Sequence, residues 1–268
     1  MSATTASVRS RTARDRSTMY RPGLLTLTRL EMRKMVDTRS GFWLLLVIAL
    51  ITVGGVALAV ILGPDANFAY EGIFQFTVIP ASVFLPLLGI LMVTTEWSQR
   101  TVMSTFTLVP QRGRVAAAKV LAGVGYTILS VLLGLALAAV GYGVAVLLDR
   151  AHPVDWSLSP EVLLASAAYE LIFILVGIAF GMLFQNSPLA IVAYLVLYFV
   201  LPIIFGVLKQ NFDTVGSALA WIDLNGNASQ LLNSDQSAPY GHVVASVAFW
   251  VVLPGVLGLV RTLKREVK

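Results

Sequence analysis

The chain has 268 residues, of which 57% are hydrophobic and 12% are charged, and its mean hydropathy is +0.82. Soluble domains are about 45–50% apolar and about 25% charged, so this composition excludes a soluble enzyme and a disordered chain. The chain contains no cysteine, which excludes a disulfide scaffold, thiol catalysis and thiolate metal sites. The apolar runs do not alternate with period two, which excludes an outer-membrane barrel.

Six apolar runs of roughly 18–30 residues follow one another, and each is long enough for a helix to cross about 30 Å of hydrocarbon. They predict an all-α integral membrane protein with six transmembrane helices, at residues 42–62, 73–95, 120–148, 162–184, 189–208 and 243–260. The first run begins beyond residue 40 and has no small-residue cleavage site behind a short basic region. We therefore expect a retained span rather than a signal peptide.

The Lys and Arg residues are distributed unequally between the ends of these spans. If the N-terminus is cytoplasmic, 17 of the 19 lie on the cytoplasmic side, and Arg150 and Lys209 lie outside. This positive-inside bias predicts a multi-pass protein of the cell (inner or plasma) membrane with both termini in the cytoplasm. The net charge of +5 then reflects topology, and we expect no binding of nucleic acid.

Two segments precede the first span. Residues 1–23 begin with a stretch rich in Ser, Thr and Arg, and we expect a disordered cytoplasmic tail. Residues 24–37 predict a basic amphipathic helix in the plane of the membrane interface. Its apolar arc consists of Leu24, Leu25, Met32, Met35 and Val36. The alternative is a solvated lead-in whose basic residues only set the orientation of the first span.

The second span and the turn after the fourth carry further signals. Pro80 and Pro86 in the second span predict a bent helix whose freed carbonyls are satisfied by neighbouring helices. Only residues 185–188 join the fourth and fifth spans, so these spans must form an antiparallel hairpin.

The longest external connection is residues 209–242. It contains two apolar segments, 215–224 and 228–232, which predict either a pair of re-entrant or interfacial helices or an irregular loop. Asn227-Ala228-Ser229 matches a glycosylation acceptor, but such triplets are common by chance.

Motifs of catalysis are absent from the sequence. There is no G-x-x-x-x-G-K-[ST] run to bind nucleotide phosphates and no H-E-x-x-H run to bind zinc. His152 and His242 stand at the external ends of spans, where they cannot form a buried catalytic pair. We expect no enzymatic activity, no metal and no cofactor on this chain.

Glu170 is the ionisable residue that lies well inside a span, about eight residues into the fourth and next to Tyr169. A carboxyl at such depth costs about 2.5–3.5 kcal/mol on insertion scales, so a function is the default interpretation. Glu170 faces a translocation path or pairs across a subunit interface, and Tyr169, Pro80 and Pro86 are candidates for the same region. The alternative is a protonated structural carboxyl that is hydrogen-bonded to a neighbouring helix, with Tyr169, Tyr194 and Tyr198 as candidate partners.

The cytoplasmic segment between the second and third spans is the most informative part of the chain. Residues 97–109 predict a short helix that Pro110 ends. One face of this helix is apolar and consists of Val102, Met103, Phe106 and Val109. An apolar face at this position must be buried, either against the bilayer surface or in a groove on a soluble partner.

This region resembles the ABC-2-type permeases, which are the membrane subunits of ATP-binding-cassette exporters. The resemblance lies in Glu96 at the end of the second span, Arg100-Thr101, Pro110-x-Arg112-Gly113-Arg114, and Lys119 opening the third span. It covers roughly residues 24–261. The family commonly has Gly before the Thr, where this chain has Arg100.

The resemblance implies a type V exporter-like transmembrane domain over residues 24–268. Residues 97–109 would be the coupling helix, seated in a cleft of a separate cytoplasmic ATPase, and residues 24–37 the connecting helix. Two permease subunits, identical or closely related, would pair in the lipid membrane with two ATPases that bind ATP and Mg²⁺ and drive alternating access. The implied contact set is Glu96, Trp97, Arg100, Thr101, Val102, Met103, Phe106, Val109, Pro110, Arg112 and Arg114.

Two other functions remain open. A proton- or ion-coupled carrier, or a channel, would use Glu170 as its titrating group. A structural subunit of a membrane assembly would account for the spans but would leave the segment between the second and third spans unexplained.

Overall fold

The computed structural model describes residues 23–62, 69–99, 111–151, 153–232 and 240–264, and all regular structure in these ranges is helical. The α-helices are α2 (Leu24–Asp37), α3 (Arg39–Leu62), α4 (Tyr70–Ser98), α6 (Arg112–Leu147), α7 (Pro160–Phe184), α8 (Ser187–Leu195), α9 (Leu201–Asn211), α10 (Asp213–Ala220), α11 (Leu224–Ser229), α12 (Tyr240–Val247) and α13 (Leu253–Lys264). Two π-helical turns, η2 (Val196–Val200) and η4 (Ala248–Val252), join α8 to α9 and α12 to α13. The prediction of an all-α fold is confirmed.

Six helical stretches within the described residues are long and apolar enough to cross a membrane. They are α3, α4, α6, α7, the continuous stretch Ser187–Asn211 and the continuous stretch Tyr240–Lys264. These six agree with the six predicted spans to within about four residues at most ends. The third span differs, because α6 begins at Arg112, eight residues before the predicted start.

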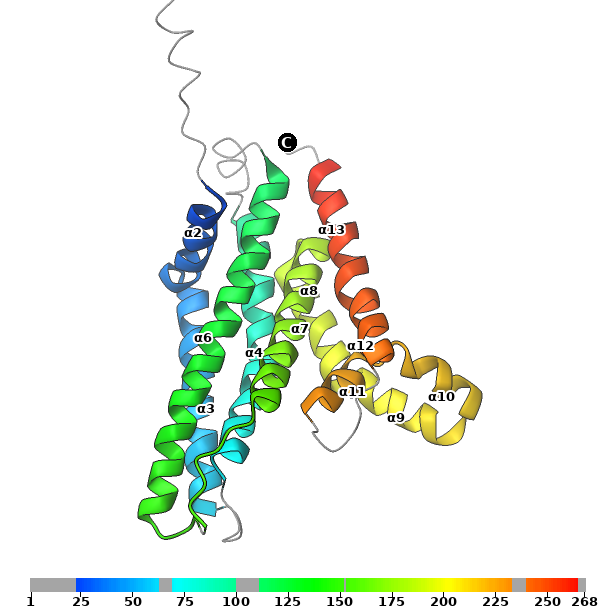
Figure 1. Cartoon of the computed structure of the whole chain (residues 1–268). Coiled ribbons are helices and arrows are strands. Elements are labelled where there is room, and N and C mark those ends of the chain that lie inside the picture. The colour runs from blue at the N-terminus through cyan, green and yellow to red at the C-terminus, as the bar shows by residue number, and fades with distance from the viewer. Residues whose placement is uncertain (1–22, 63–68, 100–110, 152, 233–239, 265–268) are drawn as a thin grey trace, which may run out of the picture.

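The core of the bundle is formed by α4 and α7, which Figure 1 shows side by side. About 61% of the most apolar stretch of α4 and 56% of that of α7 is buried, against 17–33% in the other four spans. The two backbones touch at Gly177, where a Cβ atom would lie 2.1 Å from the carbonyl oxygen of Pro86. The remaining spans pack around this pair and expose much of their apolar surface.

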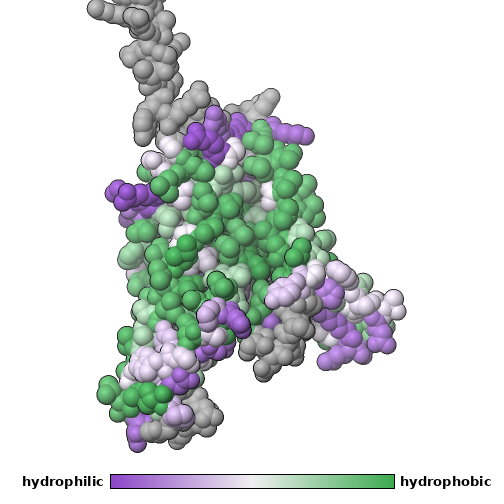
Figure 2. All heavy atoms as spheres, viewed as in Figure 1, coloured by the Kyte–Doolittle hydropathy of each residue, from purple (hydrophilic) through white to green (hydrophobic). Residues whose placement is uncertain are grey.

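The surface has the polarity expected of a protein in lipid. Figure 2 shows an apolar band over the middle of the bundle, with polar residues at its two ends. Large side chains of this band are widely exposed, such as Leu132 (56%), Val140 (66%) and Leu164 (70%). Monomeric soluble proteins rarely expose so large an apolar surface. With the six apolar helices, this indicates a multi-pass membrane protein.

The prolines of α4 do not interrupt that helix. Pro86 has no N–H to donate to the carbonyl of Ser82, four residues earlier. The hydroxyl of Tyr194, on α8, donates to this carbonyl at 2.6 Å. The prediction that a neighbouring helix satisfies a freed carbonyl is confirmed at Pro86.

The hairpin between the fourth and fifth spans is also confirmed. Gln185 ends α7 with a φ of 52°, and Asn186 then caps α8 by accepting a hydrogen bond from the N–H of Leu189 at 3.0 Å. A left-handed residue followed directly by an N-cap reverses the chain within two residues.

Most of the described part of the 209–242 connection is helical rather than irregular, with breaks at Phe212 and at residues 221–223. Its first helix, α10, has no buried residue. Its second helix, α11, packs against the core through Leu224 and Ala228, which are 1% and 0% exposed. Asn227 of the glycosylation triplet is 3% exposed, and its amide donates to the carbonyls of Ala220 and His242.

Helix α2 has the predicted bounds, and the face that it turns to the bundle is partly polar. The side that it turns to the bundle contains Leu27, Thr28, Glu31 and Met35. Of the predicted apolar arc only Met35 is buried, whereas Leu25 is 83% exposed. Leu24, Leu25 and Val36 of the arc are exposed, and α2 faces the bundle with a side that includes the carboxylate of Glu31.

Candidate functional site

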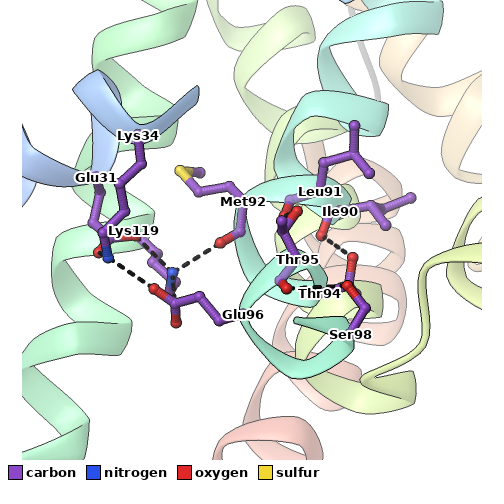
Figure 3. Close-up of polar contacts among 10 residues, drawn as sticks. All are labelled: Glu31, Lys34, Ile90, Leu91, Met92, Thr94, Thr95, Glu96, Ser98 and Lys119. Atoms are coloured by element: carbon purple, nitrogen blue, oxygen red, sulfur yellow. Dashed lines mark hydrogen bonds and ion pairs between the residues drawn. The ribbon is translucent and has the colours of Figure 1, made fainter. Parts of the chain in front are cut away.

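Four charged side chains form a closed ring where α2 meets the ends of α4 and α6 (Figure 3). Lys34 donates to Oε1 of Glu31 at 2.6 Å and to Oε1 of Glu96 at 2.8 Å. Lys119 lies 2.6 Å from Oε2 of Glu31 and 3.3 Å from Oε2 of Glu96. Each ammonium bridges both carboxylates, so the charges alternate around the ring and sum to zero. We call these four residues the ion ring.

The ion ring is largely excluded from solvent. The side chains of Glu31 and Lys119 are each 6% exposed, and that of Glu96 is 13% exposed. Lys119 uses a further proton on the carbonyl oxygen of Met92, at 2.8 Å. A buried ion pair stabilises a protein only when its hydrogen bonds are well formed, and here every carboxylate oxygen has an ammonium partner.

Lys34 closes the ring on its open side, where its side chain is 42% exposed. Partial burial lowers the pKa of Lys34, but the attraction of Glu31 and Glu96 and their hydrogen bonds outweigh this effect. The pKa of Lys34 is therefore raised above its ordinary value of 10.5. The ring thus keeps Lys34 charged at neutral pH.

The ring fixes three helices to one another at the point where the chain leaves α4 and returns into α6. Glu31 and Lys34 belong to α2, Glu96 lies in the last turn of α4, and Lys119 lies two turns into α6. A displacement of α2, of the end of α4 or of the start of α6 relative to the other two would break buried ion pairs.

The sequence prediction named some of the residues around this point. Glu96 is a ring member, and Trp97 is half-buried beside it in the last turn of α4. Arg112 donates to the carbonyl of Thr262 at 2.8 Å, at the end of α13. Arg114 lies in the first turn of α6 and donates to Oε1 of Gln111 at 3.3 Å. Residues of the predicted set that lie outside the described ranges are Arg100, Thr101, Val102, Met103, Phe106, Val109 and Pro110.

Three members of the ring were missed as a site. Lys119 was expected at the start of its span, and Glu31 and Lys34 lie in the segment predicted as an amphipathic helix but were not singled out there. The partners are separated by 62 and 88 positions, so no local pattern brings them together. The available signal was the presence of opposite charges next to the ends of three consecutive apolar segments, where an unpaired buried charge would be costly.

Glu170 lies inside the bundle and is 2% exposed. Its Oε2 atom has no hydrogen-bond partner, and the hydroxyls of Ser166 and Thr127 are also buried without one. Ser166 and Glu170 are one turn apart on α7, and Ser130 of α6 is the polar neighbour of the carboxyl. These side chains form a polar layer on α6 and α7, and none of them is paired with a member of the ion ring.

Tyr169 and the two prolines lie in a different environment from Glu170. The ring of Tyr169 packs on Phe173, with centroids 4.9 Å apart, in the cluster that α7 forms with α8 and η2. Pro80 and Pro86 are buried in α4. The hydroxyls of Tyr194 and Tyr198, expected as partners for Glu170, instead bind the carbonyl and hydroxyl of Ser82. The role of these residues in a translocation path stays a prediction.

The connection between α9 and α12 is tied to both π-helical turns. Pro202 leaves the carbonyl of Tyr198 without its helical partner, and the amide of Asn225 donates to that carbonyl at 3.1 Å. Trp250, in η4, donates from its indole to the carbonyl of Ile222 at 2.7 Å. π-helical turns inside α-helices are frequent at functional sites.

Within the residues that the structure describes, no three His, Asp or Glu side chains gather into a group that could hold a metal ion. Comparison of the chain with models of known protein families gave no match, and comparison with curated proteins found no related sequence. The described residues form a bundle with six helices that could span a membrane, a buried ion ring at one end and a polar layer in its core.

Proposed function

We propose that this chain is the permease subunit of an ATP-binding-cassette exporter of the ABC-2 type. In this proposal it moves a substrate across the membrane by alternating access, and a separate cytoplasmic ATPase supplies the energy. Six apolar helices, the asymmetric distribution of Lys and Arg and the resemblance around residues 96–119 support it. ATP and Mg²⁺ would bind to the ATPase, since the chain has no phosphate-binding loop of its own.

The ion ring is the observation that carries the proposal. A subunit driven from outside the membrane needs a rigid connection from its cytoplasmic contact segment to its spans. The ring holds α2, the end of α4 and the start of α6 together, and these helices flank the contact segment of residues 97–109. Movement of an ATPase beneath this segment would then shift α2, α4 and α6 as one unit.

The proposal is tested by disrupting the contact segment. Met103 and Phe106 belong to its predicted apolar face, and we expect Met103→Asp and Phe106→Asp to reach the membrane but to lose copurification with the ATPase. The matched control is Ser104→Asp, which places the same charge on the predicted polar face and should retain the ATPase. Retention of the ATPase by both apolar-face variants, with transport unchanged, would overturn the proposal.

A second function is favoured by one observation. The buried Oε2 of Glu170, together with the unpaired hydroxyls of Ser166 and Thr127, is an arrangement that a proton- or ion-coupled carrier would use. Such a carrier would transport when reconstituted alone under a proton or ion gradient, without any ATPase. It would lose this transport in Glu170→Gln, whereas an ATP-driven permease would show no transport by the chain alone.

A further inference from the structure

Two buried hydroxyls of the bundle, those of Thr127 and Ser166, differ from all the others in the described part of the chain. Six further buried Ser and Thr residues each donate to a carbonyl oxygen three or four residues earlier in their own helix, namely Thr28, Thr52, Thr77, Ser82, Thr94 and Ser246. Thr127 and Ser166 are 4% and 0% exposed, and their hydroxyls have no hydrogen-bond partner in the protein. These two hydroxyls therefore do not use the backbone acceptor that a helix offers to Ser and Thr.

Both hydroxyls belong to the polar layer around the carboxyl of Glu170. Ser166 precedes Glu170 by one turn of α7, and Thr127 precedes Ser130, the polar neighbour of that carboxyl, by one turn of α6. Residues three or four apart lie on the same face of a helix, and α6 packs against α7. Glu170 is 2% exposed, and its Oε2 atom also has no partner in the protein. Three buried oxygen atoms that lack a partner thus gather in one layer of the bundle.

These three groups need a partner that can both accept and donate hydrogen bonds. Each hydroxyl has a proton to donate, and the free carboxyl oxygen of Glu170 can accept one. None of the three oxygens is hydrogen-bonded to another, so the partner must span a longer gap than a direct hydrogen bond. A water molecule has two protons and two lone pairs, and buried water typically makes about three hydrogen bonds to polar groups that would otherwise lack a partner.

We propose that the polar layer binds one or two water molecules, which join Thr127 and Ser166 to Glu170 inside the bundle. The water accepts from the two hydroxyls and donates to Oε2 of the carboxyl. A metal cation fits less well, because it would bind the hydroxyl oxygens but would leave both hydroxyl protons without an acceptor. The bridging water holds α6 and α7 together by hydrogen bonds in a core that is otherwise apolar, and this role is the same in an ATP-driven permease and in a carrier.

The water is detected by solid-state NMR of the full chain in lipid bilayers, with magnetisation transferred from water to ¹³C-labelled Ser, Thr and Glu. The chain offers matched controls, since Ser246 is as buried as Ser166 and Thr52 (5% exposed) is as buried as Thr127. We expect transfer to Ser166, Thr127 and the carboxyl of Glu170 to be severalfold faster than transfer to the two controls. Equally slow transfer to Ser166 and Ser246, and to Thr127 and Thr52, would overturn the proposal.

Removal of each hydroxyl gives a second test, in which the sign of the effect decides. With water bound, Ser166→Ala and Thr127→Val lose a hydrogen bond, and the unfolding temperature of the detergent-purified chain should fall by about 2–4 °C for each. Without water, the same changes would remove a buried hydroxyl that has no partner and would raise this temperature. Ser246→Ala is the control, because the carbonyl that its hydroxyl binds lies within a helix, and it should change the temperature little. A rise or no change in both Ser166→Ala and Thr127→Val would contradict the proposal.

A bound metal cation is distinguished from water by a change of salt. Replacing sodium and potassium chloride by choline chloride at the same ionic strength should leave the unfolding temperature of the wild type unchanged. A fall in choline chloride that is absent from Glu170→Gln would mean that a metal cation, and not water, occupies the polar layer.

Discussion

At the scale of single residues, we expect substitution of Lys119 to destabilise the chain more than substitution of any other ring member. It is the one ring member whose ammonium also binds a backbone carbonyl, that of Met92. In Lys119→Met, two buried carboxylates would share the single charge of Lys34, and breaking a buried pair costs about 3–5 kcal/mol. We expect a large fall in the temperature of unfolding of the detergent-purified chain, measured by intrinsic fluorescence.

The double variant Lys119→Met/Glu31→Gln restores the charge balance and should recover part of this loss. Arg33→Met is the matched control on α2, since the pair of Arg33 with Asp37 is 78% and 62% exposed and should contribute little. If Lys119→Met and Arg33→Met unfold at the same temperature, the ion ring does not stabilise the bundle.

The raised pKa of Lys34 predicts the pH above which the ion ring stops stabilising the folded chain. Because the pKa is higher in the folded than in the unfolded chain, the stabilisation is complete below pH 10.5 and is lost as the pH rises through the folded value. Unfolding temperatures measured above pH 10.5 should therefore fall more steeply for the wild type than for Lys34→Arg, which stays charged. Parallel curves for the two proteins would rule out a contribution from Lys34.

The sequence predicted the ring only in part, for a physical reason. The hydropathy pattern located the ends of the spans, and so placed Glu96 and Lys119 near one membrane surface. The face that α2 turns to the bundle was not predicted, because the apolar spacing of a helix carries no information on the pairing of Glu31 with lysines three and 88 positions away. Long-range ion pairs of this kind depend on the tertiary packing.

At the scale of elements, the prolines of α4 show how a membrane helix tolerates the loss of a hydrogen bond. The hydroxyl of Tyr194 replaces the N–H that Pro86 lacks by donating to the carbonyl of Ser82. In Tyr194→Phe this buried carbonyl loses its partner, which should cost about 1–3 kcal/mol of stability.

A double-mutant cycle isolates this contact. In Pro86→Ala the backbone N–H of residue 86 becomes available to Ser82, so the further change Tyr194→Phe should cost much less than it does in the wild type. Tyr240→Phe, at a position that is 71% exposed, controls for loss of a tyrosine hydroxyl. Equal costs of Tyr194→Phe with and without Pro86 would mean that the hydroxyl does not compensate for the proline.

The six spans could be predicted from hydropathy because lipid imposes length and polarity on a crossing helix. The early start of α6 could not be predicted from hydropathy, because its first turns contain the polar residues Arg112 and Lys119. Tertiary contacts stabilise these two side chains in the helix. Arg112 binds the carbonyls at the end of α13, and Lys119 enters the ion ring. Likewise, the inward packing of α11 depends on contacts with α7, which lies more than 40 positions earlier in the chain.

At the scale of the whole molecule, the ends of the bundle differ in charge in the way that the membrane orientation predicts. Glu96 and Arg112, whose segments flank residues 97–109, lie at the end that also holds Arg261, and the side chain of Arg261 donates to the carbonyl of Leu183. Arg150 lies at the opposite end. The positive-inside rule predicts that the Arg261 end faces the cytoplasm.

This orientation can be measured directly because the chain has no cysteine, so a single introduced cysteine reports on its own position. Ser98→Cys lies at the ion-ring end and Ser157→Cys at the other, and both positions are exposed outside the apolar band. A membrane-impermeant maleimide applied to intact cells should label Ser157→Cys at once and Ser98→Cys only after permeabilisation. The reverse pattern would place the ion ring outside the cell, where no cytoplasmic ATPase could reach the segment beside it.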